Sequence, residues 1–375
     1  MIEVSAPGKL MLSGEWSVLE VGVPCIVLAV NKRVYCRIEK SNELEFSAPD
    51  IDIENLKGKF NGKKLTWNRE LGLDEKEKIL LPEKAIELTL RYLYEIGKKT
   101  KKFTLSTKSD ISQVVLDDGS VTKIGFGSSA AAVVAIVGAI LRLHDFDINK
   151  KENKDRIYKL AAAAHYIGQG QVGSAFDIAA STYGGAVVYQ RFDPNWLIIE
   201  IGSGKKLSEI IDGKWKAFSA KKIELPQDFV LCVAWTKSGA STKELVLKIR
   251  EFKQTNEEEY WRIINSIKNI TDQLISAIKR KDKEKISTLI KENRKYLREL
   301  SDASRNRLET DELAKLADIS DEYGAAGKFS GAGGGDCGVA VCFDLDIATK
   351  IKNAWKDASL YPINVEISRE GLKEE

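Results

Sequence analysis

Two glycines and two serines stand directly before an apolar, alanine-rich stretch that begins at Ala130; they are Gly125, Gly127, Ser128 and Ser129. Glycines let the backbone turn tightly and bring its N–H groups close to an anion. The helix predicted to follow, from Ser129, presents unpaired N–H donors and the positive end of its dipole. The serine hydroxyls can bind phosphate oxygens or magnesium. Taken alone, this segment fits a phosphate site and a serine-capped helix equally well.

Two further glycine-rich segments favour the phosphate site. Lys9 follows a Pro-Gly pair near the start of the sequence, and residues 328–338 carry a run of glycines. Neither is a Walker motif, because Gly-x-x-x-x-Gly-Lys-Ser/Thr occurs nowhere in the chain. A dinucleotide-binding turn would lead into a helix, whereas residues 331–335 lead into the strand-like run 339–343.

The order of the three motifs, a lysine loop, a Gly-Ser-Ser helix and a C-terminal glycine-rich loop, resembles that of the GHMP kinases. This superfamily comprises the galactokinases, homoserine kinases, mevalonate kinases and phosphomevalonate kinases. The spacing across the whole chain matches it as well. Because three separate motifs agree, the resemblance is specific.

Within the superfamily, the sequence looks most like the phosphomevalonate kinase family. Four segments carry this resemblance: 14–20, 164–192, 235–246 and 328–338. Mevalonate kinases resemble the first and second superfamily motifs equally well, but not the segments at 164–192 and 235–246. The resemblance implies ATP-dependent phosphorylation of (R)-5-phosphomevalonate to (R)-5-diphosphomevalonate in isoprenoid synthesis. The alternatives are a mevalonate kinase or another small-alcohol kinase of the superfamily, and a non-catalytic ligand-binding regulator. A pure binder would not need Lys9 and Asp177.

The implied fold class is α+β, with a ribosomal protein S5-like N-terminal domain and a ferredoxin-like C-terminal domain, and with the site between them. We place the domains at 1–215 and 216–375, because the segment 201–226 is irregular in pattern. Apolar periodicity predicts an amphipathic helix from Pro82 to Lys98, with the proline near its start. The predicted strands cover 2–6, 24–39, 103–108, 185–190 and 229–235, with a hairpin region at 42–68. The other predicted helices cover about 129–144, 153–167, 241–253, 257–279, 283–299 and 309–323.

The resemblance assigns the ATP phosphates to Gly125, Gly127, Ser128, Ser129 and Ala130, and magnesium to the Ser129 hydroxyl. No carboxylate occurs between His165 and Gln171, where mevalonate kinases carry a magnesium-binding glutamate. Magnesium would therefore depend on Ser129 and the phosphates.

Lys9 and Asp177 are the implied catalytic residues. Lys9 would stabilise charge on the transferred group, although a surface turn lysine has the same sequence context. Asp177 would otherwise be a loop aspartate or a helix cap. A phosphate monoester has a second pKa of about 6, so it needs no base at neutral pH. We therefore expect Asp177 mainly to hold Lys9 and the acceptor, with general-base catalysis as the open alternative.

The acceptor would need its own donors. Ser241, Thr242 and Lys243 begin a predicted helix after a glycine and form a second anion-binding N-terminus, or only a helix cap. Further candidate acceptor contacts are Ser174, Lys108 and Arg191, of which Lys108 has the better family match. The glycine-rich loop, with Ser330, Gly331, Gly333 and Gly334, could hold either nucleotide phosphates or the acceptor. For Lys108 and Arg191, an exposed ion pair is the competing interpretation.

Composition describes an ordinary soluble protein. The 375 residues carry a net charge of +3, which gives no argument for a nucleic-acid or membrane partner. No apolar run approaches a membrane span, and the opening residues lack the basic start of a signal peptide. Five cysteines, with no zinc-like spacing, predict reduced thiols in a cytoplasmic protein, and two histidines argue against a histidine-ligated metal. We expect a monomer or a homodimer.

Overall fold

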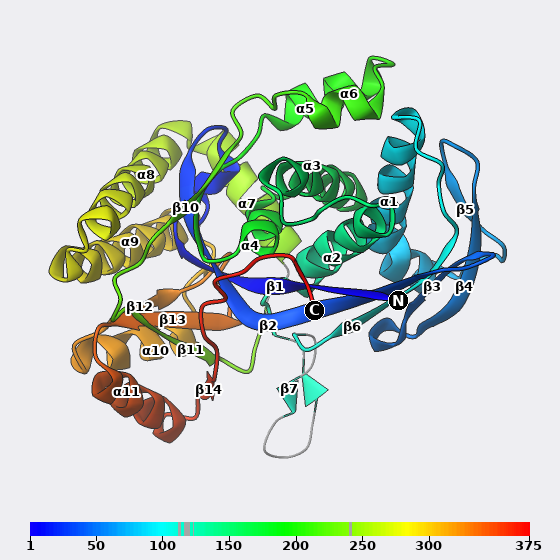
Figure 1. Ribbon diagram of the computed structural model, residues 1–375. Coiled ribbons are helices and arrows are strands. Elements are labelled where there is room, and N and C mark those ends of the chain that lie inside the picture. The colour runs from blue at the N-terminus through cyan, green and yellow to red at the C-terminus, as the bar shows by residue number, and fades with distance from the viewer. Residues whose placement is uncertain (112–113, 116–120, 123, 240–241) are drawn as a thin grey trace.

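A computed structural model describes residues 1–111, 114–115, 121–122, 124–239 and 242–375 of the chain (Figure 1). Its larger sheet is organised by one long strand, β2 (Pro24–Lys40). One edge of β2 pairs antiparallel with β1 (Ile2–Ser13), and the other pairs with β9 (Ala186–Gln190) and then β6 (Phe103–Ser109). The sheet continues past β9 with β10 (Ser219–Ile223) and past β6 with β3 (Leu44–Ala48), β4 (Ile53–Phe60) and β5 (Leu65–Trp67).

Helices cover one face of this sheet (Figure 1). They are α1 (Leu73–Glu95), α2 (Ser128–Leu143), α3 (Lys151–Gly168) and α4 (Phe176–Tyr183). The central helix, α2, contacts β1 and β2 on one side and the other three helices around it. Its sequence is apolar on nearly every side, which is typical of a helix that is buried on all sides. The short helices α5 (Pro194–Gly202) and α6 (Leu207–Asp212) lie outside this layer, with α6 against α1 and α3.

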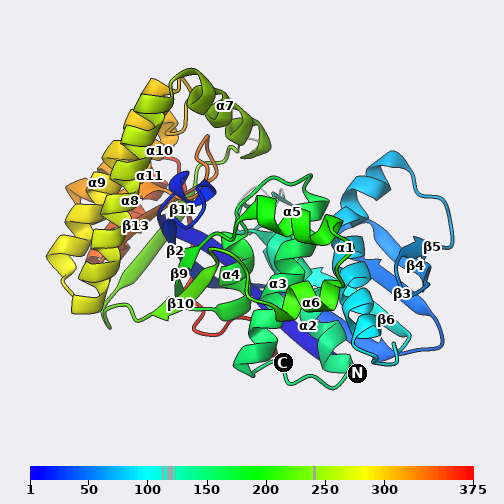
Figure 2. The same ribbon diagram turned by 90° about the horizontal axis from the view of Figure 1, so that it is seen from above.

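A second sheet carries the other half of the fold. Its strand order is β12 (Ala326–Phe329), β13 (Cys337–Cys342), β11 (Val230–Trp235) and β14 (Tyr361–Ile363), all antiparallel. Five helices accompany it: α7 (Thr242–Thr255), α8 (Glu257–Arg280), α9 (Lys283–Ala303), α10 (Asp311–Glu322) and α11 (Leu345–Asp357). Figure 2 shows α8 and α9 side by side, with α7 across one end of the pair.

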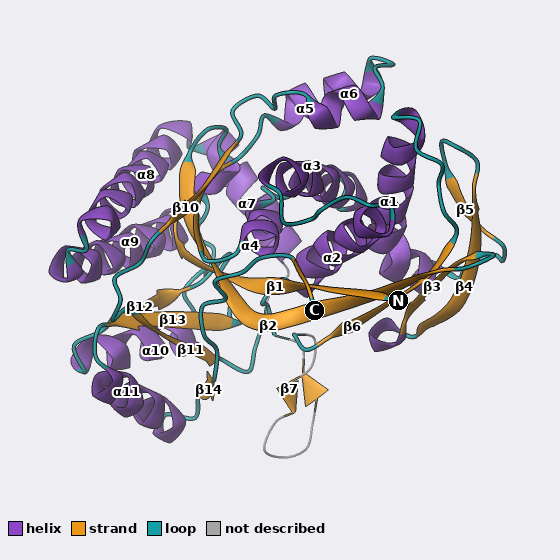
Figure 3. Ribbon diagram, in the orientation of Figure 1, coloured by secondary structure: helices purple, strands orange, loops and turns teal. Residues whose placement is uncertain are grey.

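The long α8 shows why these segments are helical. Its buried side chains, among them Ile263, Ile267, Ile270, Leu274 and Ile278, recur every three or four residues and so share one face. The opposite face is polar. Helices and strands are segregated around two sheets (Figure 3), which confirms the predicted α+β class. None of the helices in the described ranges combines the length and the apolar character that crossing a membrane requires.

The path of the chain between the sheets differs from the predicted division at 215/216. Strand β10 pairs with β9 and so belongs to the first sheet, which puts the passage to the second sheet between Ile223 and Val230. The chain also returns after β14. Strand β15 (Lys373–Glu374) pairs with β1, and Leu372 packs on α2 so closely that a β-carbon on Gly138 would lie 2.4 Å from it.

Helix α1 begins at Leu73, well before the predicted start at Pro82. The Glu75 carboxylate accepts a hydrogen bond of 3.0 Å from the N–H of Gly72, which caps the earlier start. The prediction treated the proline as a start signal. A proline within a helix removes one hydrogen bond, and the buried face of α1 continues on both sides of Pro82 with Ile79 and Ala85.

Candidate active site

A cavity of about 320 Å³ lies where segments of both halves of the fold meet. Four stretches far apart in sequence line it: the end of β1 with the turn after it, the loop before α2, the segment entering α4, and the glycine-rich loop after β12. The start of α7 and the end of α3, with His165 and Gln169, also line it. Among the residues predicted from sequence, those that line the cavity are Lys9, Gly125, Gly127, Ser128, Ser129, Ser174, Asp177, Thr242, Ser330, Gly331 and Gly333.

The loop before α2 has the geometry of an anion cradle. Gly127 is the N-cap residue of α2 and has φ +77°, a conformation that favours glycine. Ser128 and Ser129 form the first turn of the helix, one residue earlier than predicted, and both face the cavity. Ala130 is buried behind them and does not line it. The free N–H groups of this first turn therefore open onto the cavity.

Lys9 is bound to this loop through its backbone and its side chain. Its N–H donates to the carbonyl of Phe126 at 2.8 Å, and its Nζ donates to the carbonyl of Gly125 at 2.9 Å. The side chain lies along Gly127, where a β-carbon would be 3.1 Å from the Lys9 Cγ. The ammonium group is thus fixed at the mouth of the phosphate loop, and it stands 5.8 Å from the centre of the Phe176 ring.

The C-terminal glycine-rich loop contacts the same phosphate loop. The Asp336 carboxylate accepts a hydrogen bond of 3.0 Å from the N–H of Gly125. A β-carbon on Gly125 would lie 1.5 Å from the Asp336 Oδ2, so only glycine fits there as the carboxylate now stands. Asp336 itself has φ +67° and is held by Thr236 and Ser238 at the end of β11.

Asp177 lies in the first turn of α4 and faces the cavity. One of its carboxylate oxygens accepts a hydrogen bond of 2.9 Å from the N–H of Ile178. Among the described residues no ion pair joins Asp177 to Lys9, whose Nζ bonds instead to the Gly125 carbonyl. We expected Asp177 to hold Lys9. In the structure the Lys9 ammonium is held instead by the backbone of the phosphate loop.

Ser330 joins the two halves of the fold. Its hydroxyl accepts from the N–H of Met11 at 2.8 Å and donates to the Met11 carbonyl at 3.1 Å. This pair of bonds attaches the glycine-rich loop to β1 and occupies the hydroxyl that was predicted to bind substrate. Gly334 lies outside the cavity lining, with its N–H bonded to the carbonyl of Leu308 at 2.7 Å.

Two predicted acceptor contacts lie away from the cavity. Lys108 lines a separate hollow with Tyr35, Arg37 and Asp50. Arg191 is buried behind the wall, where its Nη1 donates to the carbonyl of the cavity residue Leu19 at 2.6 Å. Burial lowers the pKa of the Arg191 guanidinium.

The start of α7 is only partly described. Thr242, its first residue, lines the cavity. Ser241 and the side chain of Lys243 lie outside the described residues. In the part of the chain that the structure describes, the cavity is thus faced by three helix N-termini, those of α2, α4 and α7.

Sequence reasoning missed a buried ion pair on the cavity wall. Glu15, just after β1, pairs with Lys328 of β12, and neither side chain has any exposed surface. Burial raises the pKa of Glu15 and lowers that of Lys328, and in each case the attraction of the partner opposes the shift. Both residues lie in segments that resemble the phosphomevalonate kinase family, Glu15 in 14–20 and Lys328 in 328–338. Charged residues inside apolar and glycine-rich runs were the available signal.

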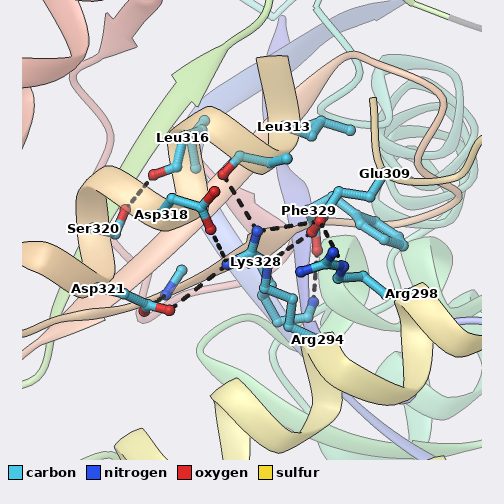
Figure 4. A network of polar contacts seen from close by, with 12 residues as sticks. Arg294, Arg298, Glu309, Leu313, Leu316, Asp318, Ser320, Asp321, Lys328 and Phe329 are labelled. Carbon is cyan, nitrogen blue, oxygen red and sulfur yellow. Dashed lines mark hydrogen bonds and ion pairs between the residues drawn. The ribbon is translucent and has the colours of Figure 1, made fainter. Parts of the chain in front are cut away.

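A second group of ion pairs lies beside Lys328 (Figure 4). Arg294 of α9 reaches Glu309 at 2.8 Å and Asp318 of α10 at 2.7 Å. Lys328 also donates to the carbonyl of Phe329 at 2.6 Å. The Arg294 ion pairs join α9 to α10, and both helices pack against β12.

The turn after β1 has a rare backbone conformation that sequence reasoning also missed. Trp16 has φ 63° and ψ −46°, and the N–H of Ser17 donates to the carbonyl of Glu15 at 2.7 Å. This bond between residues two apart defines a γ-turn with a positive φ at its centre. The Trp16 ring lines the cavity.

The protein offers few metal ligands at this site. The described residues contain no group of three His, Cys, Asp or Glu side chains placed to hold a metal ion. The Ser129 hydroxyl at the start of α2 remains as a candidate. This donor set fits Mg²⁺, which commonly keeps several waters and binds substrate phosphates with few protein ligands.

Comparison with known proteins agrees with this arrangement. The GHMP kinases N terminal domain matches residues 81–185, and the GHMP kinases C terminal domain matches residues 274–360. A phosphomevalonate kinase of Streptomyces sp. (strain CL190) is 28% identical over 98% of this chain and 97% of its own length. A mevalonate kinase of Thermococcus sibiricus is 31% identical, also over 98% of this chain and 97% of its own length.

A solved structure is similar over nearly the same extent. The Streptococcus pneumoniae phosphomevalonate kinase in complex with phosphomevalonate and AMPPNP superposes with a TM-score of 0.80 at 25% identity. The alignment covers 98% of this chain and 100% of that one. Together with the matched domains and the cavity, these similarities show that the chain belongs to the GHMP kinases.

Proposed function

We propose that this GHMP kinase catalyses the ATP-dependent phosphorylation of (R)-5-phosphomevalonate to (R)-5-diphosphomevalonate, in the mevalonate pathway of isoprenoid synthesis. The observation that carries the proposal is that one cavity is faced both by the α2 N-terminus at Ser128–Ser129 and by the α7 N-terminus at Thr242, with Asp177 of α4 as the acidic group. A kinase that joins two phosphates must bring two anions together, and each needs its own donors. Similarity to the two phosphomevalonate kinases supports this substrate.

The α2 N-terminus would hold the ATP phosphates, with Ser129 reaching Mg²⁺. When bound, Mg²⁺ neutralises charge on the phosphates. Lys9 stands at the mouth of the same loop and would stabilise the charge on the phosphoryl group as it transfers. Because the acceptor is already a dianion at neutral pH, Asp177 would orient its oxygen rather than remove a proton.

The α7 N-terminus, with Ser174 and the glycines at 331 and 333, would hold the phosphorylated acceptor. Ser129→Ala should then chiefly raise KM for magnesium-ATP, and Thr242→Ala should chiefly raise KM for the acceptor. Steady-state kinetics with each substrate varied in turn test this. The reverse pattern would exchange the two anion sites.

A mevalonate kinase is the second candidate, because the Thermococcus sibiricus relative is 31% identical over almost the whole chain. A substrate panel with coupled ADP detection separates the candidates. We expect turnover with 5-phosphomevalonate and much less with mevalonate. Equal or faster turnover of mevalonate would contradict the proposal. A protein that binds ATP but phosphorylates neither compound would be a kinase of another small alcohol or a non-catalytic regulator.

A further inference from the structure

The γ-turn at Trp16 combines a strained backbone with a bulky side chain. A positive φ is uncommon outside glycine and is a real outlier for an aromatic residue. γ-turns of this kind are rare and strained, and such strain tends to be kept at functional sites. We therefore explain this strained conformation by the position in which it holds the Trp16 side chain.

Contacts on both sides hold the turn in place. Before it, Gly14 has φ +95° and lies so close to β2 that a β-carbon there would be 2.6 Å from the Cα of Cys25. The Glu15 side chain is fixed in its pair with Lys328. After the turn, the N–H of Val18 donates to the Gly14 carbonyl at 3.0 Å. With its neighbours fixed, the direction of the Trp16 side chain is set before any ligand binds.

Trp16 is almost fully buried, with 4% of the residue's surface exposed, yet its indole Nε1–H has no hydrogen-bond partner among the described residues. Two other buried indoles, those of Trp215 and Trp355, are paired. Trp215 donates to the carbonyl of Ile210 and Trp355 to the carbonyl of Leu316, each at 2.9 Å. A buried donor without a partner is unfavourable, and in native proteins it often marks a site that another molecule completes.

The surroundings of the ring indicate which molecule. Trp16 packs in the apolar cluster that includes Val246 of α7, and Val246 lines the cavity together with Thr242. The ring therefore borders the α7 N-terminus, the end of the cavity assigned to the acceptor. Val18 and Leu19 add apolar wall on the same turn. A small, partly hydrocarbon acid would match apolar walls that stand beside one unpaired donor.

We propose that the Trp16 indole N–H donates a hydrogen bond to an oxygen of the acceptor substrate, in a part of that molecule that does not react. Trp16 is then a specificity-determining residue. The inference rests on the proposed function, in that an acceptor must bind beside α7. A carboxylate or a hydroxyl oxygen of the acceptor has the required chemistry.

The test compares Trp16→Phe, which keeps an aromatic ring and removes the donor, with the wild type. KM for the acceptor should rise about tenfold, with kcat and KM for ATP nearly unchanged, because a contact made equally in ground and transition states affects binding alone. Trp355→Phe is the matched control. It removes the N–H of another buried indole, outside the cavity, and should leave KM for the acceptor as it is.

A measurement on the wild type covers the case in which Trp16→Phe does not fold. In ¹⁵N-labelled protein, the indole N–H resonance of Trp16, assigned through its backbone, should move downfield with 5-phosphomevalonate and stay in place with ATP alone. A resonance that does not respond, or an unchanged KM in a folded variant, in an enzyme that turns over an acceptor, would overturn this inference while the proposed function stands. If the wild type uses neither 5-phosphomevalonate nor mevalonate, both fail.

Discussion

The Lys328 ammonium and the Glu15 carboxylate meet at a point where neither has any contact with solvent. Glu15 follows β1 of the first sheet and Lys328 belongs to β12 of the second, so the pair spans the junction of the two halves. The ammonium also bonds to the carbonyl of Phe329, whereas the second carboxylate oxygen of Glu15 has no partner among the described residues. The pair joins the two halves of the fold beside the cavity, which Glu15 lines.

Removing one member of this pair should be more harmful than removing both. Lys328→Met leaves a buried carboxylate uncompensated and should lower the free energy of unfolding by about 3–5 kcal/mol. Glu15→Met together with Lys328→Met replaces the pair by apolar side chains and should restore much of the loss. Thermal and urea unfolding of the two single variants and the double variant form the cycle. Additive losses would show that the two charges are independent.

Lys9→Ala should lower kcat by roughly 10²-fold or more, with a much smaller change in KM for ATP, because the ammonium is fixed where transferred charge develops. The matched control is Lys63→Ala, which removes an exposed lysine from the turn between β4 and β5. Steady-state kinetics of both variants decide the point. A kcat for Lys9→Ala as high as that of the control would make Lys9 an ordinary turn residue.

Activity should rise with pH near 6, as the acceptor phosphate loses its second proton, which happens at a pH of about 6. Asp177→Asn should lower the rate through poorer orientation of the acceptor and yet retain this rise, because the titrating group belongs to the substrate. The measurement is the pH profile of kcat/KM for the wild type and the variant. If the rise vanishes in a folded Asp177→Asn protein, Asp177 was the titrating group and general-base catalysis is the better account.

Stability should decline in mild acid because of His144. Burial lowers the pKa of its imidazole below the ordinary value near 6.5. The neutral ring is used at both nitrogens, with Nδ1 donating to the Ile140 carbonyl and Nε2 accepting from the N–H of Lys101. Below about pH 6.5 His144 binds a proton in the unfolded chain but not in the folded chain. The contribution of the neutral ring to the free energy of unfolding is therefore complete above that pH and is lost as the pH falls below it.

The check is the thermal midpoint between about pH 7.5 and pH 5.5, a window that brackets the unfolded pKa of histidine. His144→Gln removes the titrating ring and should show a smaller fall across this window, even if its midpoint is lower throughout. An equal fall in both proteins would assign the acid sensitivity elsewhere. His165 is the other histidine of the chain, and burial lowers its pKa in the same direction.

The parts of the site that depend on local conformation were predictable from sequence. The turn before α2 requires a positive φ, which the glycine at 127 permits, and the serines that follow it are typical of a helix N-terminus. Both signals come from residues that are adjacent in the sequence. The strands and most helices follow from periodicity for the same reason. The start of α1 was wrong because Pro82 is a strong local signal that a buried helix face overrode.

Contacts between distant segments were not predictable in this way. Lys328 appeared to be part of a glycine loop, whereas it lies within the buried strand β12 and pairs with Glu15, near the start of the chain. Asp177 and Lys9 were expected to touch because both belong to the site, but the backbone of Gly125 takes the ammonium instead. Single-sequence patterns report which residues share a face, not which side chains meet across two domains.

The return of residues 367–374 to the first sheet has a consequence for synthesis on the ribosome. When the chain has emerged as far as β10, one side of β1 still lacks β15, and Gly138 of α2 still lacks the Leu372 side chain that packs on it. Those contacts arrive only after the whole second sheet has been translated. The nascent first domain must therefore wait, with an unpaired strand edge beside its phosphate loop, until the second has been made.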